Sequence, residues 1–265
     1  MSETCPVCDT PAPVRVDYPV DVEPFASAGL LGCTHCGVAW MAKGAIDLDA
    51  YYADEYGANF GRKHIKNPER FFRRHETGEE KPRRWKRAMR LASLAQDKRK
   101  VLDIGSGPGL ILRALDPDKG YAVEPDRHSA ACLKHLGVRR IKLKRIGWHG
   151  PFDTVFSSHS LEHFWLEDLP QVLRKVRDVT RGRFVFEVPY WGLLRHSPEG
   201  GKHAPHTVFF TAQSVTTLLE KAGFSKVELI DPPGGTRPLL TDPAWSPSRH
   251  EAQDGKKIIY GWAEA

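Results

Sequence analysis

The sequence predicts an α/β protein with a doubly wound, mostly parallel sheet of seven strands and a small N-terminal module. From about residue 98 onward, apolar runs of strand length alternate with segments in which apolar residues recur at helical spacing. This alternation is typical of a parallel sheet that helices cover on both faces. Before it, four of the five cysteines form two close pairs, which indicates a separate module.

Strands and helices are expected in regular order along the sheet region. The apolar runs predict strands over 101–104, 120–124, 138–143, 152–157, 183–188, 226–230 and 256–262. The helical spacing predicts helices that end at Leu115, run over about 127–136, start near Asp168 and run from a Thr211 cap to Gly223. We expect the last two strands to form an antiparallel hairpin, connected by a long loop that opens at Pro232.

Length and composition exclude several classes of protein. A chain of 265 residues, 40% hydrophobic and 27% charged, can bury a proper core and lies outside the disordered and fibrous ranges. No apolar run approaches the roughly 18 residues that a membrane helix needs, and residues 1–9 lack the pattern of a signal peptide. We therefore expect a cytoplasmic protein without a membrane span.

The formal net charge of +6 is concentrated in one segment. Residues 62–100 hold 15 Lys and Arg against five Asp and Glu, a local charge of +10, so the remainder of the chain is at −4. One interpretation is the solvated face of one or two helices, because apolar residues recur among these charges. The other is an electrostatic collar that attracts an anionic substrate to a nearby site.

The paired cysteines indicate a structural zinc site. Two residues separate Cys5 from Cys8 and Cys33 from Cys36, and 24 residues separate the pairs. Two such turns can place four thiolates around one Zn²⁺, which leaves no open position for catalysis. A redox pair is the alternative, but no thioredoxin-like pattern surrounds either pair. We expect a zinc ribbon over 1–45, a basic helical connector over 46–97 and the sheet domain over 98–265.

A glycine-rich turn follows the first predicted strand. Asp103 stands two residues before Gly105, and Gly107 and Gly109 follow at the spacing Gly-x-Gly-x-Gly. Glycines here let the backbone approach a ligand closely and aim helix amides at it. The spacing differs from the dinucleotide fingerprint, because Leu110 stands where the third glycine of that fingerprint would be.

At this point the sequence resembles the class I S-adenosylmethionine-dependent methyltransferases, which have a Rossmann-like fold. Residues 101–109 look like their first motif, and residues 152–163 resemble their fourth; the likeness covers about residues 98–265. Glu124, which closes the second strand, looks like the acid that holds both ribose hydroxyls of the cofactor. The resemblance implies an S-adenosylmethionine site formed by Asp103, Gly105, Ser106, Gly107, Gly109, Glu124 and Ser158.

The cysteine pairs narrow this resemblance. Together with Tyr51–Tyr56 and residues 206–211, they resemble bacterial zinc-ribbon methyltransferases of sugar, polysaccharide and natural-product modification. This implies O- or C-methylation of a sugar-containing or other small anionic metabolite. One alternative is RNA methylation, in which the ribbon and the basic segment hold phosphates. A binding module that kept the fold without catalysis is another.

Three residues at or beyond the expected carboxyl ends of the fourth and fifth strands are candidates for catalysis: His159, Tyr190 and His206. A histidine can take the proton of a hydroxyl or acidic carbon that accepts the methyl group. A structural role at the end of the fourth strand is the alternative for Glu162 and His163. The segment His159-x-x-Glu162-His163 also resembles the Glu-x-x-Glu-His metal site of small-RNA 3′-end ribose methyltransferases, which implies a second metal ion.

Overall fold

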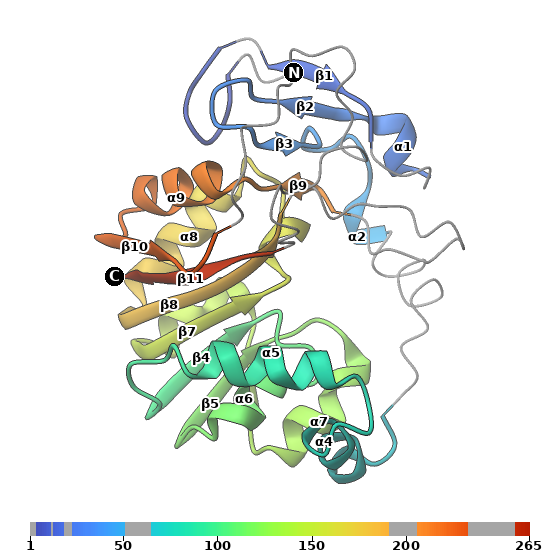
Figure 1. Cartoon of the computed structure of the whole chain (residues 1–265), viewed down its shortest axis with the longest axis vertical. Helices are drawn as coiled ribbons and strands as arrows, with labels where there is room; N and C mark the ends of the chain where they lie inside the picture. The colour runs from blue at the N-terminus through green and yellow to red at the C-terminus, as the bar shows by residue number, and fades with distance from the viewer. Residues whose placement is uncertain (1–3, 12, 19–22, 51–64, 191–205, 233–257) are drawn as a thin grey trace.

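The computed structural model describes residues 4–11, 13–18, 23–50, 65–190, 206–232 and 258–265. Within these residues the chain forms two sheets, one of seven strands and one of four, and the smaller sheet lies at the top of Figure 1. The Tyr51–Tyr56 motif and the predicted loop from Pro233 onward lie outside the described residues.

The larger sheet confirms the predicted fold class. Its order is β10-β11-β8-β7-β4-β5-β6, in which β4 to β8 run parallel and β11 runs antiparallel to both of its neighbours, β8 and β10. Its strands are β4 (Lys100–Ile104), β5 (Lys119–Val123), β6 (Arg139–Arg140), β7 (Phe152–Ser158), β8 (Thr180–Pro189), β10 (Lys226–Leu229) and β11 (Ile258–Glu264). The strand predicted over 138–143 is shorter than expected, because the chain soon turns into a 3₁₀ helix, η3 (Leu143–Trp148).

Helices cover both faces of this sheet, as the packing of two successive residues on strand β4 shows. Val101 packs in one apolar cluster with Leu91 and Ile111, whereas Leu102 packs in a second cluster with Leu173. Because successive strand side chains point to opposite faces, a strand covered on both sides is apolar throughout. The helices are α4 (Pro68–Glu76), α5 (Pro82–Ala92), α6 (Leu110–Leu115), α7 (Ala130–His135), α8 (Leu169–Asp178) and α9 (Ala212–Lys221), with 3₁₀ turns η2 (Arg127–Ser129) and η4 (Leu161–His163). Among the described helices, none combines the length and the apolar character needed to cross a bilayer.

The smaller sheet joins the N-terminal module to a distant part of the chain. Strands β1 (Val14–Val16), β2 (Leu30–Gly32) and β3 (Ala39–Trp40) form an antiparallel ribbon, flanked by short helices α1 (Phe25–Ala28) and α2 (Leu48–Ala50). The fourth strand is β9 (Val208–Phe209), which pairs with β3. One continuous apolar cluster therefore runs from the ribbon into the larger sheet. The expected boundaries at 45 and 97 stay a prediction, but the ribbon completes its sheet with residues from the expected third domain.

Helix α9 begins directly after β9 because of a capping box. Thr211 Oγ1 accepts a hydrogen bond from Ser214 N at 3.0 Å, and Ser214 Oγ accepts one from Thr211 N at 2.9 Å. Gly223, with a φ of +94°, follows the last turn as the sequence predicts. The cap therefore fixes the path of the chain between the ribbon and the larger sheet.

Candidate active site

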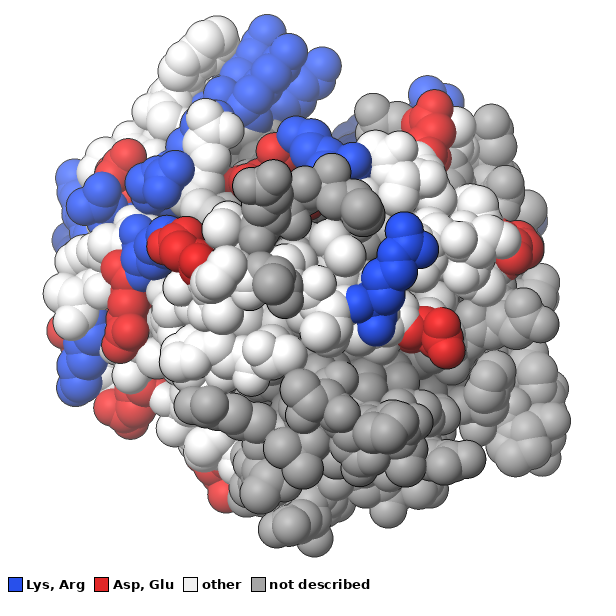
Figure 2. Space-filling view, turned by 90° about the horizontal axis from the view of Figure 1, so that it is seen from above, with Lys and Arg blue, Asp and Glu red and all other residues white. Residues whose placement is uncertain are grey.

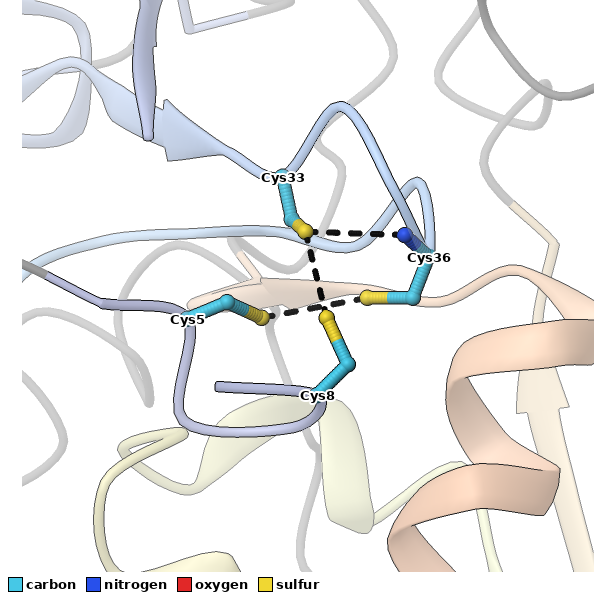
Figure 3. Close-up of side chains that lie close together, drawn as sticks. All are labelled: Cys5, Cys8, Cys33 and Cys36. Atoms are coloured by element: carbon cyan, nitrogen blue, oxygen red, sulfur yellow. Dashed lines mark hydrogen bonds between the residues drawn. The ribbon is translucent and has the colours of Figure 1, made fainter. Parts of the chain in front are cut away.

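The four paired cysteines come together within the ribbon. Figure 3 shows their sulfur atoms facing one another from two turns, and all four lie within 4.8 Å of one another. The Sγ atoms of Cys5 and Cys36 are 3.8 Å apart, and those of Cys8 and Cys33 are 3.4 Å apart. A tetrahedral zinc ion with Zn–S bonds of about 2.3 Å separates its thiolates by about 3.8 Å. The cluster is therefore compatible with the predicted zinc ribbon.

The glycine-rich turn lies between β4 and α6, at the carboxyl edge of the sheet. A side chain at Gly105 would begin 2.3 Å from Ser160 Oγ, so only glycine fits against that residue. Gly107 has a φ of +53°, and a Cβ there would meet nothing within 4 Å, so the loop faces open space. Gly109, with a φ of +87°, precedes the first residue of α6. These positions fit the close approach of a ligand to the backbone.

Glu124 holds this loop in place. Its Oε2 accepts a hydrogen bond from Gly107 N at 2.5 Å, and its Oε1 accepts one from Asp126 N at 2.8 Å. The parallel pairing of β4 with β5 brings Glu124 beside the loop. The carboxylate therefore lies directly beside the turn, where an acid can accept hydrogen bonds from a ligand diol.

Asp103 is buried in the same place without a hydrogen-bond donor. It is 1% exposed, and neither carboxylate oxygen has a hydrogen-bond partner among the described residues. Burial, and after it the nearby charge of Glu124, together raise the pKa of Asp103 to about 7. Buried acceptors are normally satisfied, so this carboxyl group fits a ligand that brings a donor or a positive charge.

A second group of titratable side chains gathers around Glu162, which is 1% exposed. His159 Nδ1 lies 3.3 Å from Glu162 Oε1. Nitrogen atoms of His163 and His206 lie with a Glu162 oxygen in one set whose members are all within 4.8 Å of one another. The rings of His163 and His206 meet edge to face, with centroids 5.1 Å apart. The structure thus brings His159 and His206 to one buried carboxylate; it also brings together the residues of the metal motif that the sequence resembles.

Glu187, near the end of β8, forms the other wall of this group. It is fully buried and pairs with Arg90, with Arg87 Nε at 3.5 Å and with His159 Nε2 at 3.2 Å. Ser158 Oγ donates a hydrogen bond to Glu187 Oε1 at 3.2 Å. His159 has a φ of +51°, an uncommon conformation for a residue other than glycine, and its N–H donates to the Glu187 carbonyl at 2.9 Å. Backbone and side chain therefore both hold His159 against Glu187.

These contacts set the charges of the group. Burial opposes charge on His159, but Glu162 and Glu187 outweigh it and raise the pKa of His159 to about 9. Burial likewise opposes ionisation of Glu162, but His159 and the other histidines lower its pKa to about 2, and the pKa of Glu187 is also lowered. Neither His159 contact is aligned as a hydrogen bond, so the attraction is that of an ion pair. At neutral pH His159 is a cation between two carboxylates.

The structure also places the other three predicted site residues, Tyr190, Ser106 and Ser158. Tyr190 follows β8, is 6% exposed and forms a parallel bridge with Phe210. Ser106 Oγ donates to the Gly107 carbonyl at 3.3 Å within the glycine-rich turn. Ser158 faces Glu187, so it lies on the histidine side rather than on the side of the turn.

Sequence reasoning missed Glu187, its two arginines and Tyr18. Glu187 had one available signal, because it is the only acid within an otherwise apolar strand end, Phe184–Val188. Arg87 and Arg90 were predicted only as members of a charged run. Tyr18, which contacts His206 as described below, lies 188 residues away from it and carries no local signal.

Acidic residues partner several arginines of the basic segment. Arg74 lies 3.4 Å from Glu80, and Arg99 lies 2.6 Å from Asp97. On the face drawn in Figure 2, Lys and Arg side chains are interspersed with Asp and Glu along one margin. Arg87 and Arg90 instead point at the buried Glu187. The described part of the segment is thus partly neutralised, and two of its members belong to the site.

Comparison with known proteins identifies the family. The chain is similar to solved structures of S-adenosylmethionine-dependent methyltransferases from Mesorhizobium loti (16% identity, 67% of this chain and 96% of that one, TM-score 0.47) and Archaeoglobus fulgidus (18%, 80% and 100%, 0.47). It is also similar to the N-terminal domain of EvdMO1, solved with S-adenosylhomocysteine and D-fucose (16%, 68% and 82%, 0.46). No curated protein matches it. The family model described as "Methyltransferase domain" matches residues 72–229, more than half of the chain. The chain therefore belongs to this methyltransferase family and is an S-adenosylmethionine-dependent methyltransferase.

Proposed function

We propose that this enzyme methylates a hydroxyl oxygen, or an acidic carbon, of a small anionic or sugar-containing metabolite, with His206 as the base. The observation that carries the proposal is the histidine group around Glu162, next to the glycine-rich turn. Ser160, which contacts Gly105, lies between His159 and Glu162 in the chain. A base at this position is close to the reacting methyl group of a cofactor bound at the turn.

The proposed cofactor site is the turn with its two acids. S-adenosylmethionine supplies a methyl group activated by its sulfonium, together with a cationic ammonium and a ribose diol. The unpartnered carboxylate of Asp103 suits the ammonium, and the carboxylate of Glu124, which lies beside the turn, suits the two hydroxyls. Gly105, Ser106, Gly107 and Gly109 form the loop that approaches the cofactor, and Ser158 lies on the border with the acceptor.

The proposed proton acceptor is a ring nitrogen of His206. His159 is already protonated at neutral pH, so it cannot accept the acceptor's proton. His206 lies beside the ionised Glu162, which stabilises the imidazolium that forms. As the acceptor atom bonds to the methyl carbon, its proton moves to His206. We keep Tyr190, which follows β8, as a further candidate on the acceptor side. Apart from proton transfer, the protein mainly has to align the acceptor atom with the methyl group.

A cation beside the base supports an anionic acceptor. His159 is charged and its side chain is 30% exposed, so it can contact a ligand. The side chains of Arg87 and Arg90 are about one third exposed, at 36% and 37%, although both pair with Glu187. A phosphate or carboxylate on the acceptor would therefore meet three positive groups and two buried carboxylates.

We also propose that the four cysteines bind a structural zinc ion. The sulfur separations fit tetrahedral thiolate coordination, and no fifth ligand is needed. A zinc ion held in this way would have a structural role in the ribbon and no catalytic one.

Methyl transfer from labelled S-adenosylmethionine tests whether His206 is the base. We expect methyl transfer to at least one acceptor in a panel of sugar phosphates, nucleotide sugars and their neutral counterparts. His206→Asn should lower the rate at least about a hundredfold and leave the Kd for the cofactor within about twofold. His135→Asn, an exposed histidine on α7, is the matched control. Wild-type rates in His206→Asn would exclude His206 as the base.

RNA methylation is the competing function, and the charge distribution weighs against it. Arginines of the basic segment pair with acids, and on the face drawn in Figure 2 Lys and Arg side chains are mixed with Asp and Glu along one margin. Binding of RNA that weakens steeply with salt would nonetheless favour this alternative. A flat salt response with transfer to a small acceptor would exclude it.

A further inference from the structure

The N-terminal ribbon meets the active site at His206. His206 lies two residues before β9, the strand that the ribbon takes from the distal part of the chain. In that pairing, Ala39 faces Phe209 and Trp40 faces Val208. Met41 N donates a hydrogen bond to the Thr207 carbonyl at 2.8 Å, which extends the pairing toward His206.

The hydroxyl of Tyr18 holds the backbone of His206 itself. It donates to the His206 carbonyl at 2.9 Å and accepts from His206 N at 3.0 Å. The ring of Tyr18 is fixed independently, because it packs against Phe25 and Phe209 with centroid separations of 5.7 Å in each case. One buried hydroxyl thus satisfies both backbone polar groups of this residue.

The same short segment is held to Glu162 from its other side. Thr207 N donates to the Glu162 carbonyl at 2.9 Å, and Thr207 Oγ1 donates to the Glu162 and Phe164 carbonyls at 3.1 and 2.6 Å. Residues 206 and 207 therefore lie between the ribbon and the loop that carries Glu162. If the contact from the ribbon is lost, His206 is held from one side only.

The cysteine cluster contacts the far end of β9. Thr211 Oγ1 donates to the Cys36 carbonyl at 2.6 Å, and Thr211 is also the cap of α9. The strand after His206 is thus attached to the ribbon at both ends, by Tyr18 before it and by the second cysteine turn after it.

We infer that Tyr18 is a positioning residue for methyl transfer, which holds the imidazole of His206 at Glu162 and toward the acceptor. The ribbon is accordingly part of the acceptor side of the active site, not an independent module. This inference rests on the proposed role of His206 as the base.

The substitution Tyr18→Phe tests the inference, because it removes the hydroxyl and keeps the ring. We expect the kcat for the acceptor found above to fall about tenfold or more, with the Kd for S-adenosylmethionine within twofold of wild type. We also expect the pKa of His206, followed by NMR of ring-labelled histidines and assigned with His206→Asn, to shift by at least half a unit. The pH profile of kcat should move with it.

Phe25→Leu is the matched control. It disturbs the packing of the same ring and lowers thermal stability at least as much, but it leaves the Tyr18 hydroxyl in place. A purely structural role for Tyr18 predicts that both variants shift the His206 titration equally, or not at all, and either result overturns the inference. If Tyr18→Phe shifts the titration while His206→Asn keeps full activity, the positioning stands and the assignment of the base fails.

Discussion

The two halves of the active site are built in different ways. The proposed cofactor side uses Asp103 on β4, the glycine-rich turn after it and Glu124 directly after the parallel neighbour β5, all within residues 103–124. The proposed acceptor side draws His159 and Glu162 from beyond β7, Glu187 from β8, two arginines from α5 and His206 from the segment that the ribbon holds. One half is a continuous motif, and the other exists only after the whole chain has folded.

This contrast predicts that the two halves can be disturbed separately. Glu124 holds the turn and Ser160 lies against Gly105, and neither residue contacts the ribbon in the interactions described above. His206 is held by Tyr18 and by the loop of Glu162. Changes in the ribbon should therefore act on the acceptor side and leave cofactor binding nearly intact.

Loss of the zinc ion proposed for the ribbon should give the largest effect. Cys36→Ala removes one thiolate, and because structural zinc sites contribute about 10 kcal/mol or more to folding, we expect the ribbon to unfold. Hydrogen exchange should then show lost protection in β1 to β3 and β9, and elemental analysis should show the loss of one zinc ion per chain. The Kd for S-adenosylmethionine should stay within about threefold.

Cys132→Ala is the control for this experiment, because Cys132 is buried on α7 outside the cluster. It should keep the zinc ion and the protection of the ribbon. A collapse of cofactor binding in Cys36→Ala alone would contradict the separation of the two halves. A second ion that survives in Cys36→Ala and disappears in Glu162→Gln would make the histidine group a metal site and exclude His206 as a free base.

The same contrast explains what the sequence could predict. The turn was predictable because Gly105 and Gly107 need a backbone without a side chain, a local requirement that leaves a local motif. The central strands β4, β7 and β8 were predictable because burial on both faces makes them mostly apolar, whereas the edge strand β6 is only the exposed pair Arg139–Arg140. The cysteine cluster was predictable because two residues between paired cysteines let both sulfur atoms of one tight turn reach a single ion, which is a local spacing that the sequence displays.

The sequence predicted His159 and His206 as candidates, but the contacts that position them escaped prediction because the partners are distant in sequence. Tyr18 reaches His206 across 188 residues, and β9 is a strand of only two residues whose partner lies in the ribbon. Arg87 and Arg90 share a charged run with exposed neighbours, and only the fold aims them at Glu187. Periodicity carries no information about such contacts.

Glu124→Gln should give the next largest effect, on the cofactor side alone. The amide keeps the size of the side chain but loses the charge and one acceptor, so hydrogen bonds to the ribose weaken. Because a hydrogen bond to a charged group contributes about 1.5–3 kcal/mol, we expect the Kd for S-adenosylmethionine to rise about a hundredfold by calorimetry. The titration of His206 should be unchanged.

The exposed Glu228→Gln on β10 is the matched control and should leave the Kd unchanged. A Glu124→Gln variant that binds the cofactor like wild type would show that the acid only holds the Gly107 and Asp126 amides. In that case the resemblance would have misassigned this residue.

The smallest effect concerns pH and Asp103. The pKa of this carboxyl is raised from its ordinary 3.8 to about 7, so the folded chain binds an extra proton between these values. The unfolding free energy should therefore fall as pH rises from about 4 to 7, the opposite of the usual trend for a paired aspartate. In Asp103→Asn this loss should disappear, and chemical denaturation at pH 5 and pH 8 measures it.

The affinity for S-adenosylmethionine should also depend on pH, and in the opposite direction to the unfolding free energy. The ammonium of S-adenosylmethionine favours the ionised carboxylate, so wild-type affinity should weaken about tenfold from pH 7.5 to pH 6 as Asp103 takes up its proton. Asp103→Asn should bind more weakly at pH 7.5 and show little change over the same range. Because Glu124 contributes to the raised pKa, Glu124→Gln should move the wild-type transition to lower pH. Identical pH dependence in wild type and Asp103→Asn would exclude Asp103 as the partner of the ammonium and leave Glu124 as the only acid proposed to bind the cofactor.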